Sequence, residues 1–358
     1  MSIYVTKSFM PPIKEYTKYI ESIYSSGILT NQGPLATELE NKLSSYLGVK
    51  NFQYVTNGTI ALQLALAALD IDGGEVITTP FSYVATTTSI LWERCTPVFV
   101  DIELNNFTID VTKIEAAITP RTRAIMPVHV FGYACNVEKI QEIANRHDLK
   151  VIYDGAHAFA SKYKGKSLLS YGDITTCSFH ATKLFHTIEG GACIIKEKDV
   201  SDKLELQRKF GHFYDDYKCV GINGKQSEFN AAMGLANFPY ISKIIAERKR
   251  VSDLYDKELS NLVQRPKQQP ELEYNYAYYP VVFRSEADLL KVFDELKKQD
   301  IYARRYFWPS LNNLPYLKET NKCPISEDIS SRIACLPLYP DLANEDVLLI
   351  SKIIKESL

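Results

Sequence analysis

One lysine stands in a place where it could do chemistry. Lys183 lies in the stretch "SFHATKLFHTIEGGACIIK", between an apolar run that ends at Ser178 and a second apolar run that follows Gly190 and Gly191. An isolated lysine is most often a solvated surface charge. A lysine whose amine is kept uncharged can instead attack carbonyl carbon atoms. The role of Lys183 therefore depends on the groups that the fold places around its amine.

Other polar residues also come directly after apolar runs. "VIYDGAH" reaches Asp154 and His157, "TTPFSYVAT" contains Tyr83, and "TNGTIAL" contains Gly58 and Thr59. In open α/β sheets ligands bind beyond the carboxyl ends of the strands, and the amides at a helix start can hold an anion. Each residue also has an ordinary structural role, such as a cap, a turn or a core position. Together they predict a site with an acid, an amine, an aromatic face and an anion cradle.

The elements that must position these residues can be predicted from hydrophobic spacing. Leu62, Ala65, Leu66 and Leu69 follow the i, i+3, i+4, i+7 pattern of a helix that begins at the Asn-Gly-Thr turn. Asn136 is a plausible N-cap for a second helix. Short apolar runs predict strands, namely "EVITTP", "PVFVD", "RAIMPV", "KVIYD", "ITTCSF" and "GACIIK". This alternation predicts an α/β domain with a mostly parallel sheet.

The pattern changes near residue 240. A polar helix "SKIIAERKRVSDLYDKELSNL" is followed by a break rich in proline and glutamine, a strand "AYYPVVF", a helix "EADLLKVFDELKKQ", and a final strand and helix. We therefore predict a large domain over residues 1–240, which includes the N-terminal segment, and a smaller α+β domain over residues 241–358.

Composition excludes several classes of protein. With 358 residues, 46% of them hydrophobic, and a net charge of −2, the chain predicts a globular protein without the basic field that nucleic acids require. Its seven scattered cysteines include no CxxC pair, so we expect no disulfide framework and no metal site. The start of the chain lacks the pattern of a signal peptide, and no apolar run has the length of a membrane span. We expect a cytoplasmic protein.

Six ordered blocks carry a resemblance to a known family. From about residue 25 onward the chain resembles the sugar aminotransferases of the DegT/DnrJ/EryC1/StrS family, in "SSGILTNQGPLATELENKLSSYLGVKNFQYVTNGTIALQLAL", "PFSYVATTTSILWERCTPVFVDIE", "PVHVFGYACNVEKIQEIANRHDLKVIYDGAHAFAS", "SFHATKLFHTIEGGA", "GINGKQSEFNAAMG" and "ACLPLYP". The resemblance implies a fold-type-I enzyme that depends on pyridoxal 5′-phosphate (PLP).

The resemblance also implies a role for each site residue. Lys183 matches the lysine that bonds to the PLP aldehyde carbon and later moves a proton. Asp154 matches the carboxylate beside the pyridine nitrogen, and His157 matches a Gln or His beside the phenolic oxygen. Tyr83 matches the aromatic residue that stacks on the ring.

The phosphate of PLP is expected at the amides of Gly58 and Thr59 and at the hydroxyl of Ser178. By the same resemblance, Asn223 reaches the phosphate from the neighbouring subunit, which implies a homodimer with a shared active site. The motif "GINGKQ" departs from the family pattern "GxNxRM", because Lys225 replaces an arginine. Lysine supplies a charge but no two-pronged contact, so the function of that arginine is open here.

The implied reaction transfers the amino group of L-glutamate to a nucleotide-linked 4-keto-6-deoxysugar. The lysine motif is most similar to members that act at C4 of dTDP-4-keto-6-deoxy-D-glucose, which would place the protein in deoxyaminosugar biosynthesis for O-antigen lipopolysaccharide. The alternatives are amination at C3, a UDP- or GDP-linked sugar, or a PLP-dependent sugar dehydratase, in whose branch a histidine replaces the lysine. A binding protein without activity is a third class.

Several residues have roles that the sequence leaves open. His180 and His186 flank the lysine motif and could select the sugar or support the loop. Arg208, Arg304 and Arg305 are candidates for the substrate diphosphate, although solvation at the surface is the more common role for any one arginine.

Overall fold

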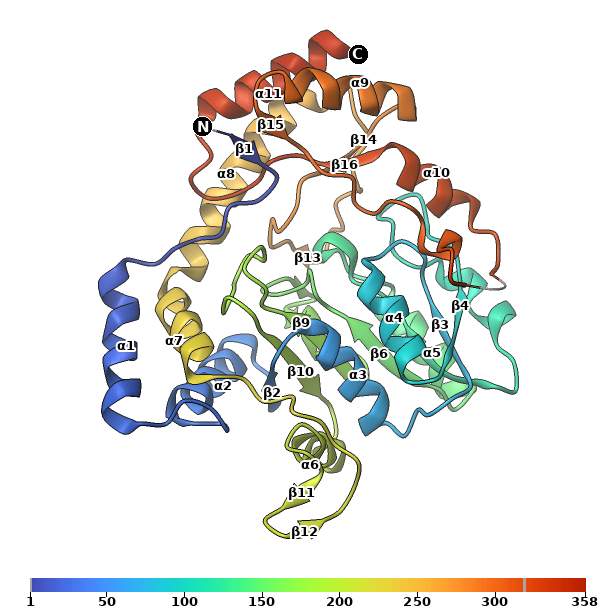
Figure 1. The fold of residues 1–358 in the computed structure, drawn as a ribbon. Coiled ribbons are helices and arrows are strands. Elements are labelled where there is room, and N and C mark those ends of the chain that lie inside the picture. Colours follow the sequence, from blue (N-terminus) through green and yellow to red (C-terminus); the bar gives the residue numbers. More distant parts are fainter. Residues whose placement is uncertain (1, 318–319) are drawn as a thin grey trace.

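A seven-stranded sheet forms the centre of the molecule (Figure 1), in the order β2-β10-β9-β6-β5-β3-β4. The structure is a computed structural model that describes residues 2–317 and 320–358. The strands in sheet order are β2 (Asn51–Val55), β10 (Gly191–Ile195), β9 (Ile174–Ser178), β6 (Lys150–Asp154), β5 (Thr122–Met126), β3 (Glu75–Thr78) and β4 (Thr96–Phe99). β10 runs antiparallel to both of its neighbours, and the other adjacent pairs are parallel. The predicted mostly parallel, mixed sheet is therefore confirmed.

The strands of this sheet are buried along almost their whole length. β3 and β10 are buried at every position, as expected where helices cover both faces of a parallel sheet. All six strands predicted from apolar runs are present. β2 was not predicted, since "NFQYV" carries polar residues, yet Gln53 is buried because its side-chain amide donates to the Ser201 backbone oxygen at 2.6 Å.

The α-helices described between residues 2 and 240 are α1 (Ile13–Ser26), α2 (Pro34–Leu47), α3 (Gly58–Ala68), α4 (Val84–Trp92), α5 (Val137–Arg146), α6 (Lys198–Gln207) and α7 (Glu228–Asn237). α3 begins where the Asn-Gly-Thr turn predicted, because Asn57 Oδ1 accepts the Ile60 amide at 2.9 Å. Asn136 caps α5 in the same way. The sequence predicted one apolar face for α3. The buried surface of the helix is wider than that face, because α3 packs against the sheet, α4 and α6 together.

The C-terminal elements have an apolar core of their own. They are α8 (Ile241–Leu259), β14 (Pro280–Val282), α9 (Glu286–Lys297), β15 (Ile301–Tyr302), α10 (Pro324–Arg332), β16 (Ile333–Cys335) and α11 (Asn344–Ser357). Figure 1 shows α9 and α11 gathered at one end of the molecule, near the N-terminus. There β1 (Ile3–Tyr4) pairs in parallel with β15. The first strand of the chain thus pairs across the division at residue 240, and that division remains a prediction.

The remaining strands form short ribbons. β7 (Lys162–Tyr163), β8 (Lys166–Ser167) and β13 (Leu272–Glu273) make a three-stranded sheet. β11 (His212–Phe213) and β12 (Asp216–Tyr217) form a hairpin that projects from the end of the molecule opposite the termini (Figure 1). Among the described residues, no helix combines the length and the apolar character that crossing a bilayer requires.

Candidate active site

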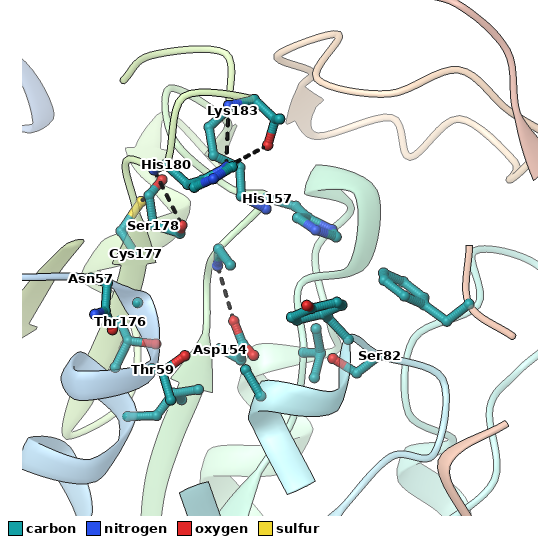
Figure 2. A pocket seen from close by; sticks show the side chains of 18 of the residues that line it. Asn57, Thr59, Ser82, Asp154, His157, Thr176, Cys177, Ser178, His180 and Lys183 are labelled. Atoms are coloured by element: carbon teal, nitrogen blue, oxygen red, sulfur yellow. Dashed lines mark hydrogen bonds between the residues drawn. The ribbon is translucent and has the colours of Figure 1, made fainter. Parts of the chain in front are cut away.

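A cavity of about 530 Å³ lies at the carboxyl ends of β6 and β9, beside the start of α3. This is the edge at which open α/β sheets bind ligands, and the volume is in the usual range for small-molecule sites. Seven of the eight site residues predicted from the sequence line it, namely Gly58, Thr59, Tyr83, Asp154, His157, Ser178 and Lys183. Figure 2 shows Thr59 and Ser82 on opposite sides of Asp154, with Lys183 further up.

Lys183 lies in the loop between β9 and β10, and its amine is enclosed by the protein. Nζ donates a hydrogen bond to Tyr278 Oη at 3.2 Å and lies 5.8 Å from the centre of the same ring. Burial lowers the pKa of this amine, while Tyr306 and Asp154 act in the opposite direction. The net effect favours the uncharged amine, which is the nucleophilic form.

Asp154 is the last residue of β6 and is only 5% exposed. One of its carboxylate oxygens accepts the Thr86 hydroxyl at 2.7 Å, and the other accepts the Ala156 amide at 3.1 Å. Thr86 is held in turn by Ser82 at 2.7 Å. Each oxygen keeps a free lone pair for a ligand, so the carboxylate is oriented within the cavity and still able to bind a cationic N–H group.

His157 has a ring whose orientation and tautomer are both fixed. The Phe131 backbone amide donates to Nδ1 at 3.1 Å, so the ring proton lies on Nε2. The ring stacks on Phe307 with centroids 5.8 Å apart and contacts Tyr278 at 4.4 Å. Burial and the nearby Lys183 charge hold the pKa of His157 well below its usual value. The imidazole is thus neutral and offers one N–H donor.

The start of α3 and the end of β9 form an anion cradle. The first amides of a helix have no partner inside the helix, and here they belong to Gly58 and Thr59. A Cβ atom added to Gly58 would lie 3.0 Å from Ser178 Cβ, and one added to Gly191 would lie 2.4 Å from the Asn57 carbonyl carbon. The two glycines therefore let the helix start, the Ser178 hydroxyl and β10 approach one another closely. Close approach, rather than a turn conformation, explains Gly191.

The two histidines of the lysine loop have different surroundings. His180 lines the cavity, where its Nδ1 lies 2.8 Å from the Thr182 hydroxyl and its Nε2 lies 3.5 Å from Glu189. His186 is buried, and its Nε2 donates to the Phe9 backbone oxygen at 2.7 Å. His186 therefore supports the loop, whereas His180 faces the ligand space.

The three candidate arginines also differ in their contacts and in whether they line the cavity. Arg208 is buried, pairs with Glu40 at 2.8 Å and donates to the Tyr54 backbone oxygen. Arg305 pairs with Glu286 at 2.7 Å and stacks on Trp308. Neither of them lines the cavity, but Arg304 does.

Asn223, the eighth predicted site residue, lies outside the cavity formed by its own chain. Its Oδ1 accepts a hydrogen bond from Lys225 Nζ at 2.7 Å, and that amine lies 4.4 Å from the centre of the Phe210 ring. Asn223 and Lys225 thus form a polar pair near the base of the projecting hairpin.

The aromatic residues in the C-terminal wall of the cavity were missed by sequence reasoning, which had named only Arg304 from this wall. The wall is formed by Tyr278, Tyr306 and Phe307 together with Arg304. The segments "NYAYYP" and "ARRYFWP" are rich in aromatic residues, which is a possible signal. Because the chain contains 23 tyrosines, that signal could not single out any of them.

A buried lysine amine, an oriented carboxylate and an anion cradle at one edge of a mostly parallel sheet define an enzyme of the α/β class that uses a lysine amine. A model of the DegT/DnrJ/EryC1/StrS aminotransferase family matches residues 12–355. The chain belongs to this family, and the resemblance predicted from the six sequence blocks is confirmed.

Named relatives cover almost the whole chain. It is 39% identical over 362 residues to the dTDP-4-amino-4,6-dideoxy-D-glucose transaminase of Shigella dysenteriae, across 99% of this chain and 98% of that protein. It is 33% identical over 348 residues to the GDP-perosamine synthase of Escherichia coli O157:H7, across 95% and 94% of the two chains. The solved structure of DesI in the presence of its TDP-sugar product superposes with a TM-score of 0.94 at 28% identity, across 99% of this chain and 92% of that chain.

Aminotransferases of this family depend on PLP, and the cavity fits that cofactor. Its donors match the chemical groups of PLP, since helix amides and a hydroxyl suit a phosphate and a carboxylate suits a protonated pyridine nitrogen. The Lys183 amine, whose pKa burial lowers, suits an aldehyde carbon.

Proposed function

We propose that this protein transfers the amino group of L-glutamate to C4 of dTDP-4-keto-6-deoxy-D-glucose, which yields dTDP-4-amino-4,6-dideoxy-D-glucose and 2-oxoglutarate. The observation that carries the proposal is the enclosed Lys183 amine in one cavity with the Asp154 carboxylate and the amides at the start of α3. Bound PLP supplies the electron sink that makes a proton on the neighbouring carbon acidic.

In this proposal Lys183 would hold the cofactor and would carry a proton to and from the carbon atoms between which the amino group moves. Burial lowers the pKa of its amine, which favours the form that can accept a proton. Asp154 holds the proton on the pyridine nitrogen through a charged hydrogen bond. The contacts from Thr86 and Ala156 fix the direction in which this carboxylate points.

The remaining groups hold the cofactor in place. We assign the phosphate to the amides of Gly58 and Thr59 and to the Ser178 hydroxyl. His157 donates its Nε2 proton to the phenolic oxygen, as the tautomer fixed by Phe131 permits. Tyr83 lines the same cavity and covers one face of the ring.

The choice of substrate rests on relatives rather than on geometry. The transaminase at 39% identity, which spans the same length, favours a dTDP-linked sugar aminated at C4. The GDP-perosamine synthase at 33% identity keeps a GDP-linked sugar as the second candidate.

We also propose that the protein acts as a homodimer in which each copy completes the active site of the other. Asn223 lies outside the cavity of its own chain. The neighbouring hairpin exposes several large apolar side chains, namely Phe213 at 68%, Tyr214 at 81%, Tyr217 at 76% and Val220 at 90%. Such a patch indicates a protein contact, and a second copy satisfies both observations.

The test is incubation of the purified protein with PLP, L-glutamate and a panel of dTDP-, UDP- and GDP-linked 4-ketosugars. We expect 2-oxoglutarate and a sugar aminated at C4, with the position of nitrogen determined by NMR. The Lys183→Ala variant should lose activity by several orders of magnitude, and turnover in that variant would refute the mechanism. Release of ammonia without an aminosugar would favour the dehydratase alternative.

A further inference from the structure

The cavity contains a cationic side chain to which the proposed chemistry gives no role. Arg304 follows β15 and lines the C-terminal wall of the cavity. Its backbone is fixed by two hydrogen bonds with Cys335, one from each amide, at 3.1 and 2.8 Å. Its side chain is exposed. The guanidinium is thus presented from a rigid part of the fold.

The surroundings leave this guanidinium available for a ligand. Within residues 2–317 and 320–358, it forms neither an ion pair nor a side-chain hydrogen bond, and its nearest described aromatic contact is the Tyr306 ring at 5.0 Å. The neighbouring Arg305 is engaged elsewhere, since its Nη2 donates to Glu286 and to the Ser331 backbone oxygen and its guanidinium lies over the Trp308 ring.

Of the cationic side chains that the described part of this chain contributes to the cavity lining, one is not assigned to the cofactor and can bind a substrate. Among its described lining residues, Lys183 and Arg304 are the only lysine and arginine. Lys183 is assigned to the cofactor, and the phosphate of the cofactor is assigned to α3. Both substrates of the proposed reaction are anions, since glutamate carries carboxylates and the ketosugar carries a diphosphate.

Arg304 also lies close to the reacting centre. Its charge acts on both Tyr278 and Tyr306, and it lowers the pKa values that burial raises in these two phenols. Tyr278 is the residue that accepts the hydrogen bond from Lys183. The guanidinium and the reactive amine thus line the same cavity, and each has a tyrosine of its C-terminal wall as a neighbour.

From this arrangement we infer that Arg304 is the residue that recognises the oxyanion of a substrate, either a carboxylate of the amino donor or the diphosphate of the ketosugar. The inference rests on the proposed function and extends it. A guanidinium forms two parallel hydrogen bonds with either group, which a lysine cannot do. The Tyr306 ring, whose centre lies 5.0 Å from the guanidinium carbon, favours a cation at this position.

Separate measurement of the two half-reactions shows whether Arg304 binds the carboxylate of glutamate or the diphosphate of the sugar nucleotide. Glutamate converts the cofactor to its amine form without any sugar. The aminosugar product, through the reverse of the second half-reaction, also converts the cofactor to its amine form, without glutamate. Each is followed by the absorbance of the cofactor in single-turnover experiments with the holoenzyme. In Arg304→Gln we expect the half-saturating concentration of one substrate to rise about 10- to 100-fold, while the maximal rate changes little.

Two further variants serve as controls. Arg304→Lys retains the charge but not the fork, so it should recover only part of the affinity. Arg305→Gln removes a neighbouring charge that lies outside the cavity, and its affinities for both substrates should match those of the wild type. Thermal unfolding of each variant shows that the fold is retained.

The outcomes are distinct. A change confined to glutamate assigns Arg304 to a carboxylate, and a change confined to the sugar nucleotide assigns it to the diphosphate. Unchanged affinities for both substrates in Arg304→Gln overturn the inference and leave the proposed function intact. A wild-type protein that is silent in both half-reactions overturns the proposed function and this inference with it.

Discussion

His157 combines a fixed tautomer with a depressed pKa, and both properties can be measured. Because Phe131 donates to Nδ1 and the pKa lies well below its usual value, the ring should stay neutral with its proton on Nε2 throughout pH 6 to 8. Nitrogen NMR of the histidine side chains tests this directly. A midpoint for His157 inside that pH range would contradict the described environment.

Substitution of His157 tests the role of the Nε2 donor. His157→Leu removes the donor and should weaken PLP binding about tenfold and shift the cofactor absorbance band, since a hydrogen bond to a charged oxygen contributes about 1.5–3 kcal/mol. His157→Gln keeps an N–H donor and should retain most of the affinity. Equal losses in the two variants would point to packing instead of the hydrogen bond.

Single residues were predictable where a motif fixes their neighbours in the chain. Asp154, Ser178 and the start of α3 each end or begin a predicted element, so topology alone brings them to one edge of the sheet. Tyr306 and Arg304 come from a segment more than a hundred residues further along. No local pattern predicts that this segment folds back over the sheet. The aromatic residues of the C-terminal wall were therefore missed.

A short N-terminal strap, residues 3–9, connects two parts of the active site. At one end β1 pairs with β15, which leads into Arg304. At the other end the Ser8 hydroxyl donates to the Ala181 backbone oxygen at 2.7 Å, and the Phe9 backbone oxygen accepts from His186. The strap therefore holds the lysine loop against the C-terminal wall.

Loss of the strap contacts should impair positioning more than binding. We expect Ser8→Ala and His186→Asn to lower kcat about tenfold or more and to shift the pH dependence of the cofactor absorbance, because small displacements of a reacting group are costly. PLP affinity should change little. Ser331→Ala is the matched control, since its hydroxyl also donates to a backbone oxygen at 2.7 Å but lies on α10, outside the cavity. An unchanged pH dependence in both variants would count against a positioning role.

Elements were predicted best where hydrophobic spacing and caps agree. α3 and α5 satisfy both criteria. The six strands were predicted from apolar runs alone, and all of these elements form. β1 and the hairpin of β11 and β12 consist of two-residue strands. Their pairing depends on residues distant in the chain or on a turn, so periodicity has too few positions to reveal them.

At the level of the whole molecule, the proposed dimer assigns Asn223 of one copy to the active site of the other. Asn223→Ala alone should weaken PLP binding about tenfold, because one hydrogen bond to a charged phosphate is lost. That result by itself does not say which cavity the residue serves. A mixed dimer identifies that cavity, because its two chains carry the substitutions of Lys183 and Asn223 separately.

In a mixed dimer of Lys183→Ala and Asn223→Ala chains, isolated through two affinity tags, the cavity of the Asn223→Ala chain contains its own Lys183 and can receive Asn223 from the Lys183→Ala partner. If Asn223 acts across the interface, that site is intact, and the dimer should have about half of wild-type activity at PLP concentrations too low for the Asn223→Ala homodimer. The matched control pairs Lys183→Ala with Asp154→Asn. Lys183 and Asp154 line the same cavity of one chain, so no site in this dimer is complete and activity should stay absent. If the Lys183→Ala/Asn223→Ala mixed dimer is no more active than the Asn223→Ala homodimer at the same PLP concentration, Asn223 serves the cavity of its own chain. That result would refute the shared arrangement.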